Sequence, residues 1–119
     1  MFAGLPADDL VAVADVVREL DASAGQVLTI EGRIGHDVFV VLEGLIEVRR
    51  DDEVVDVLGE GAVVGEVAVF TDGRRNATVI ARTDVRLGVI EQQALLDLVD
   101  AIPLLADRLS AVVRIRSTG

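Results

Sequence analysis

Residues 64–79 read Val-Gly-Glu-Val-Ala-Val-Phe-Thr-Asp-Gly-Arg-Arg-Asn-Ala-Thr-Val, and this stretch, called the cassette below, is the most informative part of the chain about its fold. Neighbouring short strands usually need only a tight turn between them, but here about ten residues separate the two apolar ends. The cassette begins with Gly-Glu, continues with small and apolar residues, and ends with two arginines before the next strand. Residues 67–70 are predicted to form one short helical turn, and Gly65 lets the backbone come close to a ligand.

The cassette has the chemistry to hold a sugar phosphate. Free N–H groups at the start of a short helix attract anions, and Arg75 adds a planar fork of donors that suits phosphate. When it is ionised, the Glu66 carboxylate can accept hydrogen bonds but cannot donate them, so it suits the hydroxyl groups of a sugar. Taken singly, Arg75 is more often a solvated or ion-paired arginine, and Glu66 is a helix cap or the partner of Arg75. The combination predicts a cradle for a phosphate and a ribose.

Short apolar runs on both sides of the cassette are typical of strands. Glycine and aspartate turns separate them at the spacing that is typical of a sandwich or a jelly roll, and Asp51-Asp52 is a predicted hairpin turn. The seven predicted strands cover residues 27–30, 38–42, 45–48, 54–58, 62–64, 78–80 and 85–90.

Helices are predicted at both ends of this β region. Pro6 suits a helix start and apolar residues recur after it at helical spacing, which predicts a helix over residues 6–20. Residues 91–116 are predicted to form C-terminal helices, interrupted at Pro103. The predicted fold is mainly β with flanking helices: a jelly-roll β-barrel, or double-stranded β-helix, over residues 24–90, with an N-terminal helix, a short cassette helix and C-terminal helices. We expect residues 1–119 to form a single domain.

The composition excludes most catalytic chemistry. All 11 basic residues are arginines, and the chain has no cysteine, no lysine and a single histidine, His36. Without cysteine or lysine there is no thiol nucleophile, zinc finger, P-loop lysine or Schiff base. One histidine cannot build a multi-histidine metal centre, and no serine lies in a hydrolase elbow. We therefore expect no catalytic residue, no metal site and no enzyme activity.

The charge of the chain excludes further classes of partner. With 21 acidic and 11 basic side chains, the formal net charge is -10, which disfavours binding to nucleic acids or to anionic membrane surfaces. No apolar run approaches the ~20 residues that span a bilayer, and the first residues do not resemble a signal peptide, so we expect a cytoplasmic location. The charge is locally positive beside the cassette, however. Four arginines fall within thirteen residues whose only acidic member is Asp84: Arg74, Arg75, Arg82 and Arg86.

The chain resembles the cyclic nucleotide-binding domain family, which includes catabolite-activator-type regulators, kinase regulatory subunits and nucleotide-gated channels. The phosphate-binding cassette of that family has Gly-Glu, then aliphatic-Ala-aliphatic, a short spacer, and Arg followed by a small residue, Ala, Thr or Ser, and Val. Residues 64–69 and 75–79 follow this pattern, and the step from Glu66 to Arg75 matches the common family spacing. The resemblance extends over almost the whole chain.

The resemblance implies a role for each cassette residue. Glu66 would accept a hydrogen bond from the ribose 2′-hydroxyl, and Arg75 would pair with the cyclic phosphate. Ala68 and Asn76 would donate backbone N–H groups, and Ala77 would keep the wall of the site thin. The implied ligand-binding set is Gly65, Glu66, Val67, Ala68, Arg75, Asn76 and Ala77.

The resemblance also implies a base pocket and a lid. Val48 and Val55 are candidates for the base pocket, and the predicted helix over residues 104–116 lies where the family has its hinged lid. The residues that would cover the base are Val112, Val113 or Arg116.

Two cassette positions depart from the family pattern. Arg74 stands where many members have proline, and Asn76 stands where alanine, serine or threonine is usual. A threonine after the arginine is associated with guanine contacts in the family, so Asn76 leaves the base open, with cAMP expected ahead of cGMP.

The expected function is that of a regulatory sensor for a cyclic purine nucleotide, with no other cofactor. An effector domain or a partner protein would read the movement of the lid, and whether the chain is part of a longer protein stays open. The alternative is a degenerate barrel that serves protein–protein contact, because the chain lacks tyrosine and tryptophan to cover a base. A homodimer through the last helix is a further option, since Leu105, Leu109 and Val112 form an apolar seam, although packing of this seam on its own barrel is the expectation.

Overall fold

The computed structural model of the chain describes residues 4–69 and 71–108. The described helices are α1 (Ala7–Val16), α2 (Glu66–Val69) and α3 (Gln92–Ala101). The described strands are β1 (Arg18–Ala22), β2 (Val27–Thr29), β3 (Val38–Glu43), β4 (Ile46–Arg50), β5 (Glu53–Leu58), β6 (Val63–Val64), β7 (Thr78–Ala81) and β8 (Val85–Ile90). All seven predicted strands and the helical turn of the cassette are confirmed.

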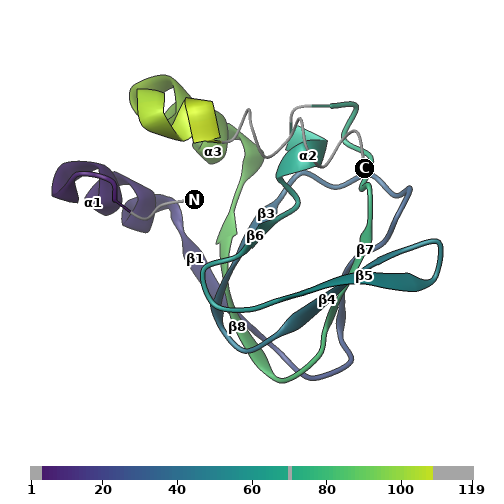
Figure 1. The fold of residues 1–119 in the computed structure, drawn as a ribbon. Helices are drawn as coiled ribbons and strands as arrows, with labels where there is room; N and C mark the ends of the chain where they lie inside the picture. The colour runs from purple at the N-terminus through teal and green to yellow at the C-terminus, as the bar shows by residue number, and fades with distance from the viewer. Residues whose placement is uncertain (1–3, 70, 109–119) are drawn as a thin grey trace.

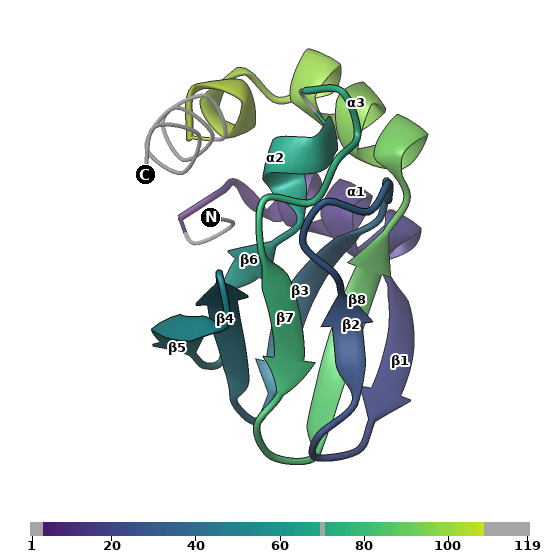
Figure 2. The same ribbon diagram turned by 90° about the vertical axis from the view of Figure 1, so that its right-hand side faces the viewer.

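The strands of the described residues form two antiparallel sheets of four, in the orders β1-β8-β3-β6 and β2-β7-β4-β5 (Figure 1). Figure 2 shows β2, β7 and β4 in front of β3 and β8, with α1 and α3 beyond one end of the sheets. The prediction of a mainly β fold with flanking helices is confirmed. The eight strands remain two hydrogen-bonded sheets, so the jelly roll is not a closed barrel within the part of the chain that the structure describes.

Strand β3 is buried on both faces, and it therefore joins two apolar cores. Successive side chains of a strand point to opposite faces. Val38 and Val40 pack with residues of the helices, including Leu95 of α3. Phe39 and Val41 face the second sheet and belong to the core between the sheets.

The connection between β4 and β5 is a two-residue hairpin turn, as the sequence predicts. Asp51 and Asp52 both have positive φ angles, 52° and 66°, and link the paired residues Arg50 and Glu53. Two positive φ angles suit the right-handed twist of a tight hairpin, and aspartate tolerates them better than most residues. The turn fixes the register of a hairpin that lines the candidate site.

The prediction of a helix over residues 6–20 is wrong at its C-terminal end. Helix α1 ends at Val16, Val17 is extended, and β1 follows at once and pairs with β8. Residues 18–22 have side chains that a helix accommodates well, but backbone pairing with β8 outweighs this local preference. The β region therefore begins at residue 18 instead of residue 24.

The C-terminal helices are described only in part. Helix α3 begins one residue after the predicted start, and a second helical segment begins at Pro103 and is described as far as residue 108. Leu105 has no exposed surface and packs in the core with Ile90 and Leu95, so it faces its own domain. Leu109 and the predicted lid residues Val112, Val113 and Arg116 lie outside the described residues. Among the described helices, none combines the length and apolar character needed to cross a bilayer.

Candidate functional site

The end of the cassette is fixed by backbone hydrogen bonds to a loop more than thirty residues earlier in the chain. The Arg75 N–H donates to Arg33 O at 2.8 Å, and the Gly32 N–H donates to Arg75 O at 2.8 Å. A bridge between Ile34 and Arg74 continues this pairing. The position of Arg75 is therefore set by the fold.

The Arg75 guanidinium lies in a slot between two glycines. Its Nη1 donates to Gly65 O at 3.3 Å, and its Cζ lies 6.0 Å from the centre of the Phe39 ring. A Cβ atom on Gly35 would lie 2.5 Å from Nε of Arg75, and one on Gly65 would lie 2.7 Å from Nη1. Gly65 also has a φ of +91°, which few other residues adopt. The absence of a side chain at both positions leaves space for the guanidinium, and a Cβ at either position would overlap it.

Arg75 is a desolvated cation beside two carboxylates. Its residue exposure is 8%, and burial lowers the pKa of the guanidinium below its ordinary value. The charges of Asp37 and Glu66 oppose that shift and raise the pKa. Since a guanidinium stays protonated in proteins and carries five donors, it can still bind an anion.

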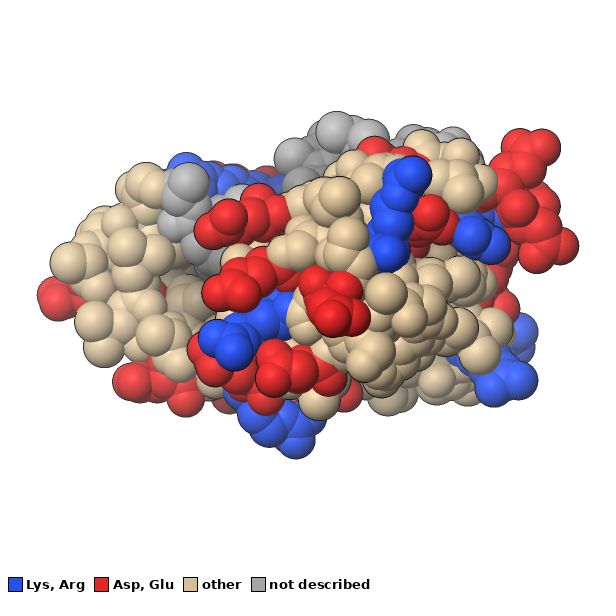
Figure 3. All heavy atoms as spheres, turned by 90° about the horizontal axis from the view of Figure 1, so that it is seen from below, with Lys and Arg blue, Asp and Glu red and all other residues tan. Residues whose placement is uncertain are grey.

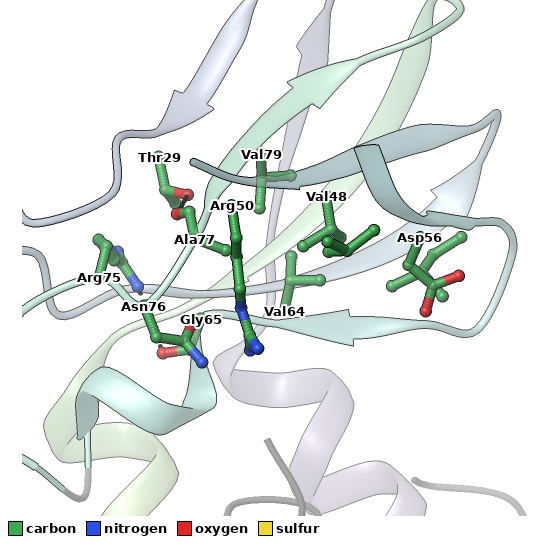
Figure 4. A pocket seen from close by; sticks show the side chains of 12 residues that line it. Thr29, Val48, Arg50, Asp56, Val64, Gly65, Arg75, Asn76, Ala77 and Val79 are labelled. Atoms are coloured by element: carbon green, nitrogen blue, oxygen red, sulfur yellow. Dashed lines mark hydrogen bonds between the residues drawn. The ribbon is translucent and has the colours of Figure 1, made fainter. Parts of the chain in front are cut away.

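A pocket of about 270 Å³ opens beside this arginine (Figure 4). Its polar end contains Arg75 and Asn76, and valines form much of its wall. The residues that line it are Thr29, Val48, Arg50, Val55, Asp56, Leu58, Val64, Gly65, Arg75, Asn76, Ala77 and Val79. Concave sites with an apolar wall and a few polar groups are typical of small-molecule binding.

The structure brings most of the predicted site residues to this pocket. Gly65, Arg75, Asn76 and Ala77 line it, and so do the two base-pocket candidates Val48 and Val55. The other three predicted residues lie in α2 with little exposed surface, at 1% for Glu66, 5% for Val67 and 2% for Ala68. Glu66 is close enough for its charge to act on Arg75, whereas the neighbouring Arg74 is exposed and pairs with Asp72 at 3.4 Å.

Sequence reasoning missed several residues of the site, among them Thr29, Gly35, Arg50 and Asp56. Thr29 is buried and donates from Oγ1 to Ala77 O at 3.0 Å, which holds the thin wall of the pocket. Arg50 and Asp56 come from the β4–β5 hairpin, and the signal that could have found them is their place beside the predicted turn. Among the described residues, no group of three or more His, Asp or Glu side chains is placed to hold a metal ion.

Comparison with known proteins identifies the family to which the chain belongs. The model of the cyclic nucleotide-binding domain matches residues 19–101. The chain is 34% identical over 88 residues to the cGMP-dependent protein kinase egl-4 of Caenorhabditis elegans. The aligned region covers 74% of this chain and 11% of the kinase. It is 31% identical over 81 residues to the cAMP-dependent protein kinase regulatory subunit of Schizosaccharomyces pombe, covering 67% of this chain and 20% of that protein. The chain thus spans only a small part of these curated relatives.

Solved structures show the same fold. The Thermus thermophilus catabolite activator protein superposes with a TM-score of 0.88 at 23% identity, over 98% of this chain and 57% of that one. The N-terminal domain of a transcriptional regulator from Streptomyces coelicolor superposes with a TM-score of 0.77 at 29% identity, over 98% and 87%. The family that the cassette predicts is confirmed by the family model and by curated relatives above 30% identity. The chain belongs to the cyclic nucleotide-binding domain family.

Proposed function

We propose that this chain is a regulatory sensor domain that binds a cyclic purine nucleotide, cAMP or cGMP, with the cyclic phosphate on Arg75. The observation that carries the proposal is the buried Arg75 guanidinium, held between Gly35 and Gly65 at the polar end of a pocket. A cation that has lost most of its water gains from an anionic ligand, because the ligand replaces the missing solvation. The phosphate of a cyclic nucleotide has the charge and the acceptor geometry for this arginine.

The rest of the pocket suits the other parts of such a ligand. Glu66 would accept the ribose 2′-hydroxyl, and the backbone N–H groups of Ala68 and Asn76 would complete the phosphate site. Val48 and Val55 offer an apolar wall to the faces of a purine. Ala77 is small enough to let the ligand approach the strand behind it.

The proposed output is a conformational change read by another domain or a partner protein. The two curated relatives described above are a protein kinase and a protein kinase regulatory subunit by name, and the chain covers a small fraction of each. The helical segment that begins at Pro103 is proposed as the start of a movable lid over residues 104–116. A ligand shifts the lid only as far as it binds one lid position more tightly than the other. The chain itself is proposed to have no catalytic role.

Isothermal titration calorimetry with cAMP and with cGMP tests the proposal. We expect at least one nucleotide to bind with micromolar affinity or tighter. Arg75→Ala should weaken binding about thirtyfold or more, because it removes one partner of a buried charged pair. Glu66→Ala should weaken binding without abolishing it.

Arg74→Ala is the matched control. Arg74 is the next residue in the chain and carries the same charge, but its side chain is exposed and paired with Asp72. It should leave the affinity within about threefold, since surface ion pairs contribute little. A folded protein that gives no heat with either nucleotide at millimolar concentration would overturn the proposal and favour the protein–protein alternative.

A further inference from the structure

A second cavity, of about 290 Å³, lies in the bend of the chain between β2 and β3. Strand β2 is the outer strand of its sheet, and the chain turns back after it with a hydrogen bond from the Arg33 N–H to Ile30 O at 3.1 Å (Figure 2). The lining combines aliphatic residues with two arginines: Val27, Leu28, Ile30, Ile34, Arg33 and Arg75. Of the residues that line the pocket described above, called the first pocket here, Thr29 and Arg75 also line this second cavity.

The Arg75 guanidinium presents different atoms to the two cavities. Its Nη1 lies beside Gly65, which lines the first pocket, and donates to Gly65 O at 3.3 Å. Its Nε and Nη2 lie beside Gly35, which lines the second cavity, since a Cβ on Gly35 would lie 2.5 Å from Nε and 2.8 Å from Nη2. The bond to Gly65 O is the one hydrogen bond that the guanidinium makes with the described residues. The Nε–Nη2 edge therefore keeps its donors for a ligand, and two donors in a plane suit a carboxylate.

The lining of the second cavity has positive charge and apolar surface, and it contains no acidic residue among those described. This is unusual for a chain with 21 acidic side chains. The side chain of Arg33 is exposed, and the ion pairs among the described residues do not include it. Ile30 and Ile34 are 39% and 69% exposed, so a ligand with an apolar body would remove apolar surface from water.

We propose that the second cavity is a further ligand site, which binds a small carboxylate with an apolar body, such as a medium-chain fatty acid. The carboxylate lies between Arg33 and the Nε–Nη2 edge of Arg75, and the hydrocarbon chain lies against Ile30 and Ile34. An arginine fork matches the planar carboxylate with two parallel hydrogen bonds. An anion without an apolar body would leave both isoleucines in water, so the lining favours an amphipathic ligand.

The two sites are coupled because they share Arg75. This part of the inference rests on the proposed function, since it assumes a cyclic phosphate on the Gly65 side of the guanidinium. Two anions on one guanidinium repel each other, and a carboxylate on the Gly35 side draws the cation away from Gly65. Each ligand should therefore weaken the binding of the other, and thermodynamic linkage requires the same factor in both directions.

Octanoate, titrated in the absence of nucleotide, tests the site itself. Calorimetry should give a dissociation constant of about 1 mM or tighter, as expected for a ligand of this size. Acetate lacks the apolar body and octan-1-ol lacks the charge, so each should bind at least about tenfold more weakly. In two-dimensional nitrogen–proton NMR spectra, octanoate should shift the amide signals of residues 27–35 and leave those of Val48 and Val55 unchanged.

Two variants separate the contributions of charge and of apolar surface. Arg33→Gln keeps most of the side chain without its charge and should weaken octanoate binding about fivefold or more. Arg82→Gln is the matched control, because Arg82 is also an exposed arginine but pairs with Glu47 at 3.6 Å and does not line the cavity. It should change octanoate binding by less than about twofold. Ile34→Ser should weaken octanoate binding about fivefold and leave the protein folded, since Ile34 is largely exposed.

Binding that both Arg33→Gln and Ile34→Ser leave unchanged, or signal shifts at Val48 and Val55 in place of residues 27–35, would overturn the inference. The coupling is tested by titrating cAMP and cGMP in octanoate held about tenfold above its dissociation constant, where the apparent nucleotide affinity should fall about fivefold or more. Unchanged nucleotide affinity would overturn the shared role of Arg75. If octanoate binds and neither nucleotide does, the proposed function and the coupling fail and the second site stands. If a nucleotide binds and octanoate does not, the second site is overturned and the proposed function stands.

Discussion

Gly35 and Gly65 have complementary roles around one guanidinium. At Gly65 the backbone requires a positive φ, so the residue is restricted even without a neighbour. At Gly35 no positive φ is involved, and the three atoms nearest to an added Cβ all belong to the Arg75 side chain. A substitution at Gly35 can therefore move the Arg75 side chain without straining the backbone.

Gly35→Ala should displace Arg75 and weaken nucleotide binding about tenfold, because the new methyl group would overlap Nε and Cζ of the arginine. The free energy of unfolding should fall by only about 1 kcal/mol, since a side chain can shift where a backbone cannot. Calorimetry and urea denaturation measure the two effects. Gly59→Ala is the control, as its Cβ would lie 3.3 Å from Cδ2 of the Leu45 side chain, and its distance of 3.9 Å from Gly44 O is ordinary contact. Equal binding by Gly35→Ala and the wild type would contradict this view of the slot.

Sequence reasoning at the residue scale found the parts of the site that lie close together in the chain. The family resemblance of the cassette implied that Gly65, Arg75, Asn76 and Ala77 belong to one binding site, and all four line one pocket. Gly35 left no signal, because its contact is made with a residue forty positions later. Such contacts depend on the pairing of strands, which a single sequence does not display.

At the scale of elements, local preference predicted the strands well and the end of the first helix poorly. The glycine and aspartate turns marked the limits of the strands between β2 and β8, and the Asp51-Asp52 turn has the expected geometry. Strand β1 was missed because four of its five residues are exposed, so it has little apolar alternation to detect. Its conformation is determined by β8, which lies far along the chain.

Leu95→Ala should lower the free energy of unfolding by about 2–5 kcal/mol, since Leu95 has no exposed surface and anchors α3 in the core shared with β3. Urea denaturation followed by circular dichroism measures the change. Leu104→Ala provides the comparison, because its side chain belongs to the next helical segment and the residue is 43% exposed. That variant should lose less than about 1 kcal/mol. Similar losses in the two variants would mean that α3 contributes little to the core.

At the scale of the whole molecule, the acidic excess and the proposed anion-binding pocket are compatible because charge acts over a limited range. The face seen in Figure 3 shows acidic side chains interspersed with arginines. In a buffer near physiological ionic strength, exposed charges more than about 8 Å apart are largely screened from each other. The buried Arg75 would interact with the proposed phosphate at contact, where screening is weak.

Adding salt should stabilise the folded protein at the low end of the concentration range. The formal net charge of -10 makes the compact state repel itself, and salt reduces this repulsion. Thermal denaturation at about 0.01 M and about 0.15 M NaCl should show a higher midpoint at the higher concentration, since the screening length falls from about 30 Å to about 8 Å. A lower midpoint in 0.15 M NaCl would mean that attractive pairs such as Arg49–Glu47 outweigh the overall repulsion.

The backbone hydrogen bonds between Arg75 and residues 32–33 have a consequence for moving this site into another protein. A peptide cut from the chain at residues 63 and 81 would contain every residue of the cassette, but it would leave behind the loop to which Arg75 is bonded and the glycine that makes room for it. Transplanting the cassette alone would therefore transfer its amino-acid sequence without the contacts that hold Arg75 in position. A successful graft would need two separate segments, residues 32–37 and the cassette, set at the right distance by a host with the same pair of sheets.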